Sequence, residues 1–130
     1  MAPVLARAQA PKKVLIVEDN ELNMKLFHDL LDAQGYETLQ TREGLQALAL
    51  AREHKPDLIL MDIQMPVMDG YEATRRIKAD PALKSIPVIA VTSYALSGDE
   101  EKARSAGCDD YIAKPYSPRQ MLAKVREIIG

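Results

Sequence analysis

The 130-residue sequence has a single cysteine, Cys108, which excludes an internal disulfide. One cysteine fits a reducing compartment, and we expect a cytoplasmic location. No apolar run approaches the roughly 20 residues that a membrane-spanning helix needs. The first ten residues lack the hydrophobic stretch of a signal peptide. A net charge of −2 gives no indication of a general binder of nucleic acids or anionic membranes.

The composition is that of a globular domain. Hydrophobic residues make up 47% of the chain and charged residues 28%, as in soluble proteins. A length of 130 residues suffices for one domain with one core, but not for two ordinary domains. We therefore expect a flexible N-terminal tail over residues 1–11 and a single domain over residues 12–130.

Short apolar runs alternate with amphipathic segments along the chain. Four runs are not interrupted by polar residues, which is typical of strands buried on both faces of a parallel sheet. They are Val14–Val17, Leu58–Met61, Val88–Val91 and Tyr111–Ala113, and a more polar run at Tyr36–Gln40 belongs at a sheet edge. Helical patterns follow each run, with capping boxes predicted at Ser97 and Ser117. Five strand–helix repeats predict an α/β fold, a doubly wound parallel sheet in the flavodoxin-like order 2-1-3-4-5.

Polar residues follow the predicted strands. Glu18 and Asp19 end the first strand, and Asp62 ends the third. Thr92 ends the fourth strand, and Lys114 follows the fifth. Ligands of such folds bind beyond the carboxyl ends of the strands, where the strand order reverses. We therefore expect all five side chains at one edge of the sheet.

These residue types predict metal-assisted phosphoryl chemistry. Three clustered carboxylates repel one another unless a cation neutralises them. Oxygen ligands favour Mg²⁺ or Mn²⁺, and the pattern lacks the cysteine or histidine set of a zinc centre. A carboxylate beside such an ion can attack phosphorus and form an acyl phosphate, while a nearby lysine stabilises the charge.

Each of these residues also has a structural interpretation. Glu18 and Asp19 could serve only to complement the positive N-terminus of the following helix. Asp62 could be an acidic turn residue, Thr92 a structural residue at a strand end, and Lys114 a solvated surface residue. Their coincidence at one predicted edge favours the functional interpretation.

Four segments together resemble the receiver domains of two-component signalling. These segments are VLIVEDNELN at 14–23, LILMDIQMPVMDG at 58–70, VIAVTSYA at 88–95 and YIAKP at 111–115. The resemblance covers residues 12–130. Residues 12–45 are especially similar to the DivK-like group of stand-alone receivers in bacterial cell-cycle control, whereas residues 64–72 and 114–120 look like more general small regulators.

The resemblance implies a role for each site residue. Asp62 is the phosphoacceptor, and Mg²⁺ is held by Glu18, Asp19, Asp62 and the backbone carbonyl of Gln64. Thr92 and Lys114 bind the phosphoryl oxygens, and Tyr111 is an aromatic switch that turns inward when Thr92 moves. The surface of the last two helices and the strand between them then changes shape.

The resemblance also implies the partners. They are a histidine kinase or histidine phosphotransfer protein and a downstream protein target, with no direct contact to nucleic acid and no membrane insertion. The chain would be no enzyme beyond catalysing its own phosphorylation and dephosphorylation. The first helix carries two apolar stripes, Leu22–Leu26–Leu30 and Met24–Phe27–Leu31. The second stripe either docks a partner or packs against the last helix, and packing is favoured because both helices should cover the same face of the sheet.

Two other functions and one other domain context remain as alternatives. An aspartyl-phosphate phosphatase would carry a D-x-D nucleophile after the first strand, where this chain has Glu18-Asp19-Asn20. A flavodoxin-like binding module would need a Ser/Thr/Gly-rich phosphate loop at that position, which is absent. The chain could also be a receiver cut from a hybrid kinase or a longer regulator.

Overall fold

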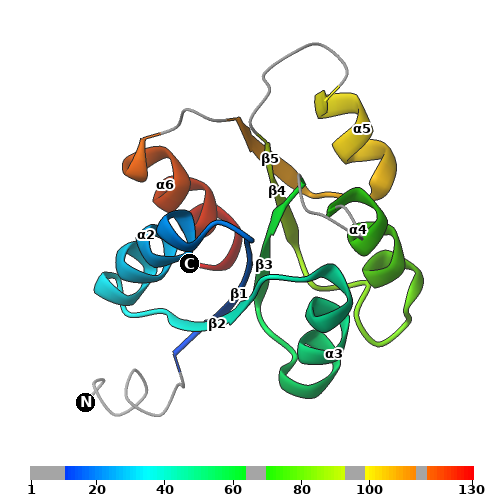
Figure 1. Ribbon diagram of the computed structural model, residues 1–130, viewed down its shortest axis with the longest axis horizontal. Helices are drawn as coiled ribbons and strands as arrows, with labels where there is room; N and C mark the ends of the chain where they lie inside the picture. The colour runs from blue at the N-terminus through cyan, green and yellow to red at the C-terminus, as the bar shows by residue number, and fades with distance from the viewer. Residues whose placement is uncertain (1–10, 64–69, 93–98, 114–116) are drawn as a thin grey trace.

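A five-stranded parallel sheet forms the centre of the molecule (Figure 1). The computed structural model describes residues 11–63, 70–92, 99–113 and 117–130, with Thr92, Asp99, Glu100 and Ala113 described by their backbone alone. The strand order is β2-β1-β3-β4-β5, which confirms the predicted flavodoxin-like topology. The strands are β1 (Lys13–Val17), β2 (Glu37–Thr41), β3 (Leu58–Asp62), β4 (Val88–Thr92) and β5 (Asp110–Ala113).

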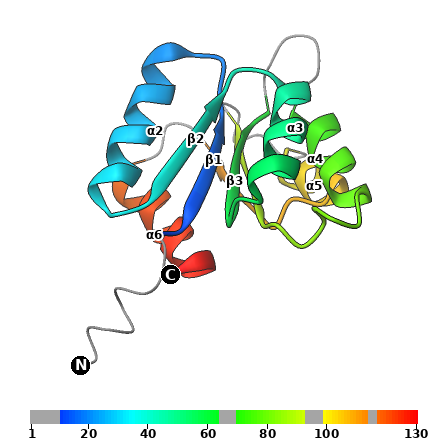
Figure 2. The same cartoon turned by 90° about the horizontal axis from the view of Figure 1, so that it is seen from below.

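Helices cover both faces of this sheet (Figures 1 and 2). They are α2 (Glu21–Ala33), α3 (Gly44–His54), α4 (Gly70–Ala79), α5 (Asp99–Ala106) and α6 (Pro118–Ile129). Helices α2 and α6 lie on one face, and α3, α4 and α5 lie on the other. Alternate residues of the central strands point into the two resulting cores, so Ile16 and Leu60 pack on the α2/α6 side while Val17 and Met61 pack on the other. None of the helices in the described ranges is long and apolar enough to cross a membrane.

Local capping sets where two of the helices begin. Asn20 caps α2, because its side chain accepts a hydrogen bond from the backbone N–H of Asn23. The predicted capping box at the start of α6 is present between Ser117 and Gln120. The box predicted at Ser97 lies outside the described residues. The Asn20 cap matters for function, since it fixes the chain immediately after Asp19.

The second apolar stripe of α2 is the buried one. Phe27 and Leu31 are almost fully buried and share a core cluster with Met121 and Val125 of α6, which confirms the packing interpretation. In the first stripe, Leu30 is partly buried against the same cluster, whereas Leu22 is 79% exposed and Leu26 is 43% exposed. This large apolar surface on α2 therefore has no covering element in the described part of the chain.

Cys108 lies in the core on the α3–α5 side of the sheet. Burial raises the pKa of its thiol, and a weak hydrogen bond to the hydroxyl of Thr74, at 3.8 Å, offsets part of that rise. A buried, protonated thiol is a packing group and not a nucleophile.

Candidate functional site

The sheet register brings the ends of β1 and β3 side by side. Val17 of β1 lies opposite Met61 of β3. The next residues along the two strands are Glu18 and Asp62, which therefore occupy neighbouring strand ends. The chain leaves β1 toward α2 on one face and leaves β3 toward α4 on the other (Figure 1), which makes this edge the point where the strand order reverses.

Three carboxylates converge at this edge. Glu18, Asp19 and Asp62 each place one carboxylate oxygen within 4.8 Å of the other two. Glu18 is 1% exposed and Asp62 is 4% exposed, whereas Asp19 faces solvent. The expected convergence of the three residues is thus confirmed. Like charges at this spacing repel one another, and a bound cation would neutralise them.

The donor set fits a hard divalent cation. All three groups offer carboxylate oxygens, and within the described ranges the cluster contains no cysteine or histidine. Mg²⁺ binds one or two protein carboxylates and keeps several waters, which suits a cluster with one solvent-exposed member. This arrangement is consistent with magnesium and unlike a structural zinc centre.

Backbone contacts hold the acidic pair in place. The backbone N–H of Glu18 donates to the carbonyl of Thr41 on β2, at 3.0 Å. The Oε2 atom of Glu18 accepts from the backbone N–H of Asn20, at 3.1 Å. Because Asn20 also caps α2, the acidic pair lies between a fixed strand end and a fixed helix start.

Helix α4 begins directly on the backbone of the third carboxylate. The N–H of Gly70 donates to the carbonyl of Ile63, at 3.0 Å. A Cβ atom at Gly70 would lie 2.4 Å from the carbonyl oxygen of Asp62 and 2.7 Å from the Cα of Ile63. Only glycine permits this approach, and residue type and spacing did not predict it.

The remaining predicted site residues are placed only in part. Asp62 pairs with Val91 of β4, and Thr92 is the next residue of that strand. Thr92 pairs in turn with Ala113 of β5, the residue before Lys114. The side chain of Thr92 and the whole of Gln64 and Lys114 lie outside the described residues. Tyr111 is half-buried and packs against the core on the α3–α5 side of the sheet.

Known proteins share both the sequence and the fold. Residues 14–126 match the response regulator receiver domain family. The polar-differentiation response regulator DivK of Brucella anthropi is 58% identical over 120 residues, which are 92% of this chain and 98% of that protein. The DivK protein of Brucella ovis is likewise 58% identical, over 119 residues and 97% of its length.

Solved structures of receiver proteins have the same fold as this chain. One is the receiver domain of a sensor histidine kinase from Pseudomonas aeruginosa PAO1, which has a magnesium ion coordinated in its active-site cleft. It is 39% identical to this chain with a TM-score of 0.86, and the match covers 93% of this chain and 99% of that one. The chemotaxis protein CheY4 of Vibrio cholerae is 27% identical with a TM-score of 0.87, covering 92% and 100%. The motifs, the strand order and the acidic edge agree with these matches, and the chain belongs to the response regulator receiver domain family, the signalling switches of two-component phosphorelays.

Proposed function

We propose that Asp62 accepts a phosphoryl group from the phosphohistidine of a histidine kinase or histidine phosphotransfer protein. The observation that carries this proposal is the convergence of Asp62 with Glu18 and Asp19 from two neighbouring strand ends. An oxygen of the Asp62 carboxylate forms the new P–O bond while the P–N bond of the donor breaks. The bonding electron pair stays on the imidazole nitrogen, which then takes up a proton.

Glu18, Asp19 and Asp62 hold Mg²⁺ in this proposal, with the backbone carbonyl of Gln64 as a further ligand; Mn²⁺ suits the same oxygens. The ion, when bound, neutralises the carboxylates and the oxygens of the phosphoryl group. The buried position of Glu18 and Asp62 supports this role, because buried carboxylates are stabilised by a cation. Magnesium in the cleft of the related Pseudomonas aeruginosa receiver supports it too.

Phosphorylation then changes the surface formed by α5, β5 and α6. A phosphoryl group adds about two negative charges at neutral pH, and Thr92 and Lys114 bind its oxygens. Tyr111 turns inward as Thr92 moves, which shifts the population between two states of one fold. The output is contact with a protein target or onward phosphotransfer, and the chain acts on no other substrate. By likeness to the DivK proteins we assign this output to polar differentiation and the cell cycle.

The phosphodonor docks on α2 in this proposal. Leu22, in the first turn of α2, and Leu26, one turn later, are exposed leucines on the helix that begins two residues after Asp19. Exposed apolar groups that lie together on a surface mark interaction sites, and a few residues of an interface carry most of its binding energy.

Asp19→Asn is expected to weaken Mg²⁺ binding at least tenfold, since the variant loses one of three charged ligands. Asp19 is exposed, so its amide leaves the core intact. Calorimetric titration measures the affinity for Mg²⁺. Electron paramagnetic resonance, which detects the free ion, measures the affinity for Mn²⁺. Asp29→Asn, which removes an exposed carboxylate of α2 paired with Lys25, is the matched control. Equal Mg²⁺ affinities in the wild type and Asp19→Asn would show that Asp19 is not a ligand of the metal.

Leu22→Ser combined with Leu26→Ser is expected to lower kcat/KM for phosphotransfer from the kinase about tenfold or more, because interface hot spots lose over 1 kcal/mol each on truncation. Labelling by acetyl phosphate should not change, since that donor needs no docking surface. Leu45→Ser is the control, because Leu45 is 55% exposed but lies on α3, on the other face of the sheet. A kinase that phosphorylates the double variant at the wild-type rate would place the docking surface elsewhere.

A further inference from the structure

Thr41, the last residue of β2, is a buried polar residue with no role in the proposed chemistry. It is 4% exposed, and in the described part of the chain the other buried polar residues are Glu18, Asp62 and Thr74. Its carbonyl oxygen accepts the backbone N–H of Glu18, at 3.0 Å. Thr41 therefore touches the backbone of a proposed metal ligand directly, from the neighbouring strand.

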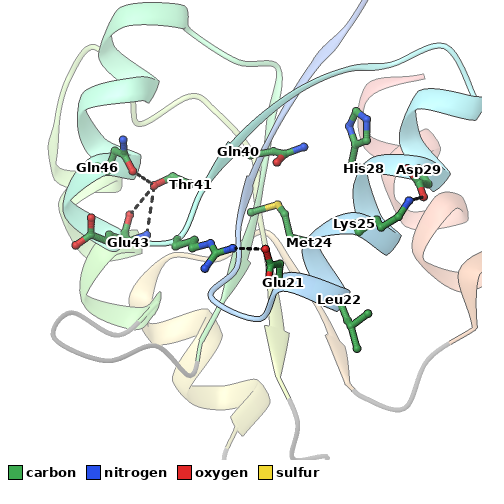
Figure 3. Close-up of a pocket in the computed structure, with 11 residues that line it drawn as sticks. Glu21, Leu22, Met24, Lys25, His28, Asp29, Gln40, Thr41, Glu43 and Gln46 are labelled. Carbon is green, nitrogen blue, oxygen red and sulfur yellow. Dashed lines mark hydrogen bonds and ion pairs between the residues drawn. The ribbon is translucent and has the colours of Figure 1, made fainter.

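The side chain of Thr41 fixes the position of that carbonyl. Its hydroxyl donates a hydrogen bond to Oε1 of Gln46 on α3 and accepts one from the backbone N–H of Glu43, at 3.3 Å (Figure 3). Glu43 is the N-cap residue of α3. One buried hydroxyl thus ties the end of β2 to the start of α3, and the peptide between them has little freedom to rotate.

Arg42, the residue after Thr41, contacts the chain on the other side of the Glu18–Asp19 pair. The guanidinium of Arg42 forms an ion pair with the carboxylate of Glu21, the first residue of α2, at 3.2 Å. The turn therefore contacts the chain before Asp19, through Glu18, and after it, through Glu21. The Arg42–Glu21 pair is exposed and contributes little on its own, which leaves the buried contacts of Thr41 as the stronger constraint.

We propose that Thr41 is a positioning residue for the metal site: its hydroxyl fixes the β2–α3 turn, and the turn fixes the backbone of Glu18 and hence the spacing of the Glu18–Asp19 pair. The inference rests on the proposed metal site and adds a residue that binds neither metal nor phosphate. Residues behind the direct ligands commonly orient them, and their loss typically costs 10- to 100-fold in metal affinity. Because Thr41 acts through its backbone, the loss of its hydroxyl is expected to weaken Mg²⁺ binding by about 3- to 10-fold.

A purely structural role makes a different prediction. If the Thr41 hydroxyl served only to begin α3, its removal would lower the stability of the metal-free protein and leave metal affinity unchanged. The two quantities are measured separately, by urea unfolding without metal and by titration with Mg²⁺ alone. A conservative replacement separates them further, since serine keeps the hydroxyl and loses only a methyl group.

The experiment compares Thr41→Val, Thr41→Ser and Thr38→Val with the wild type. Thr38→Val is the matched control: Thr38 lies on the same strand and its hydroxyl bonds to Nδ1 of His28, at 2.6 Å, away from the acidic edge. We expect weaker Mg²⁺ binding in Thr41→Val, affinity restored by Thr41→Ser, and wild-type affinity in Thr38→Val. Gln46→Ala, at an exposed position, removes the partner of the hydroxyl and tests the same bond if Thr41→Val fails to fold.

Two results separate this inference from the function on which it rests. A wild-type protein that binds Mg²⁺, with Thr41→Val and Gln46→Ala binding equally well, overturns the role of Thr41 alone. A wild-type protein that binds no Mg²⁺ overturns the metal site itself, and the inference with it. Thr41→Ser as weak as Thr41→Val would also contradict the account, because the hydroxyl would then not be the group that matters.

Discussion

Asp62→Asn is expected to yield a folded protein that takes up no phosphoryl group from acetyl phosphate or from a kinase. The amide nitrogen and oxygen of asparagine fill nearly the volume of the carboxylate, so the buried site keeps its packing. The amide lacks the nucleophilic oxygen that forms the P–O bond. Removing one of three clustered charges also relieves repulsion, and we expect the metal-free variant to be as stable as the wild type or up to about 1 kcal/mol more stable.

Intact-protein mass spectrometry after incubation with acetyl phosphate and Mg²⁺ measures the uptake, and urea unfolding measures the stability. Asp29→Asn is the control, because it removes an exposed carboxylate outside the acidic cluster and should be labelled like the wild type. Stoichiometric phosphorylation of folded Asp62→Asn would show that another residue is the acceptor.

Gly70→Ala is expected to destabilise the protein by about 2–3 kcal/mol, the upper range for overpacking in a well-packed core. The added Cβ would lie 2.4 Å from the carbonyl oxygen of Asp62 and 2.7 Å from the Cα of Ile63. Both neighbours are backbone atoms, which cannot rotate away as a flexible side chain can. Helix α4 must therefore move off the end of β3 or displace Asp62 itself.

A displaced Asp62 should also react more slowly. Misplacement of a reacting group by about 1 Å can cost on the order of 100-fold in rate, and we expect at least a tenfold slower uptake from acetyl phosphate under conditions where Gly70→Ala is folded. Gly35→Ala provides the control: Gly35 has a φ of +91°, but a Cβ added there would meet no atom within 4 Å. That variant should lose roughly 1 kcal/mol through backbone strain alone and keep the wild-type rate. A Gly70→Ala protein with wild-type stability and rate would contradict the close approach.

The strands were predictable because a strand buried on both faces of a sheet is an uninterrupted run of apolar residues. Each apolar run, such as Leu58–Met61, lies within one residue of the observed strand at either end. The apolar stripes of α2 were harder to assign, since Leu22–Leu26–Leu30 and Met24–Phe27–Leu31 have equally good helical spacing. Which stripe is buried depends on how α2 is rotated against α6 and the sheet, and that rotation is set by tertiary packing.

The acidic cluster was predictable for a topological reason. Parallel strands present their carboxyl ends at one edge, so Glu18, Asp19 and Asp62 had to meet once the order of strands was known. Contacts between loops carry no comparable pattern. The bond from Glu18 to Thr41 and the approach of Gly70 to Asp62 depend on strand register and turn geometry, and neither follows from residue type or spacing.

The identity of the phosphorylated residue tests the central claim most directly. The wild-type protein is incubated with acetyl phosphate, with Mg²⁺ or with EDTA, reduced with borohydride, digested and mapped by mass spectrometry. Borohydride converts an aspartyl phosphate to homoserine and so marks the acceptor. We predict homoserine at position 62 in the Mg²⁺ sample and little or none with EDTA; homoserine at another aspartate, or equal labelling with and without Mg²⁺, would contradict the account.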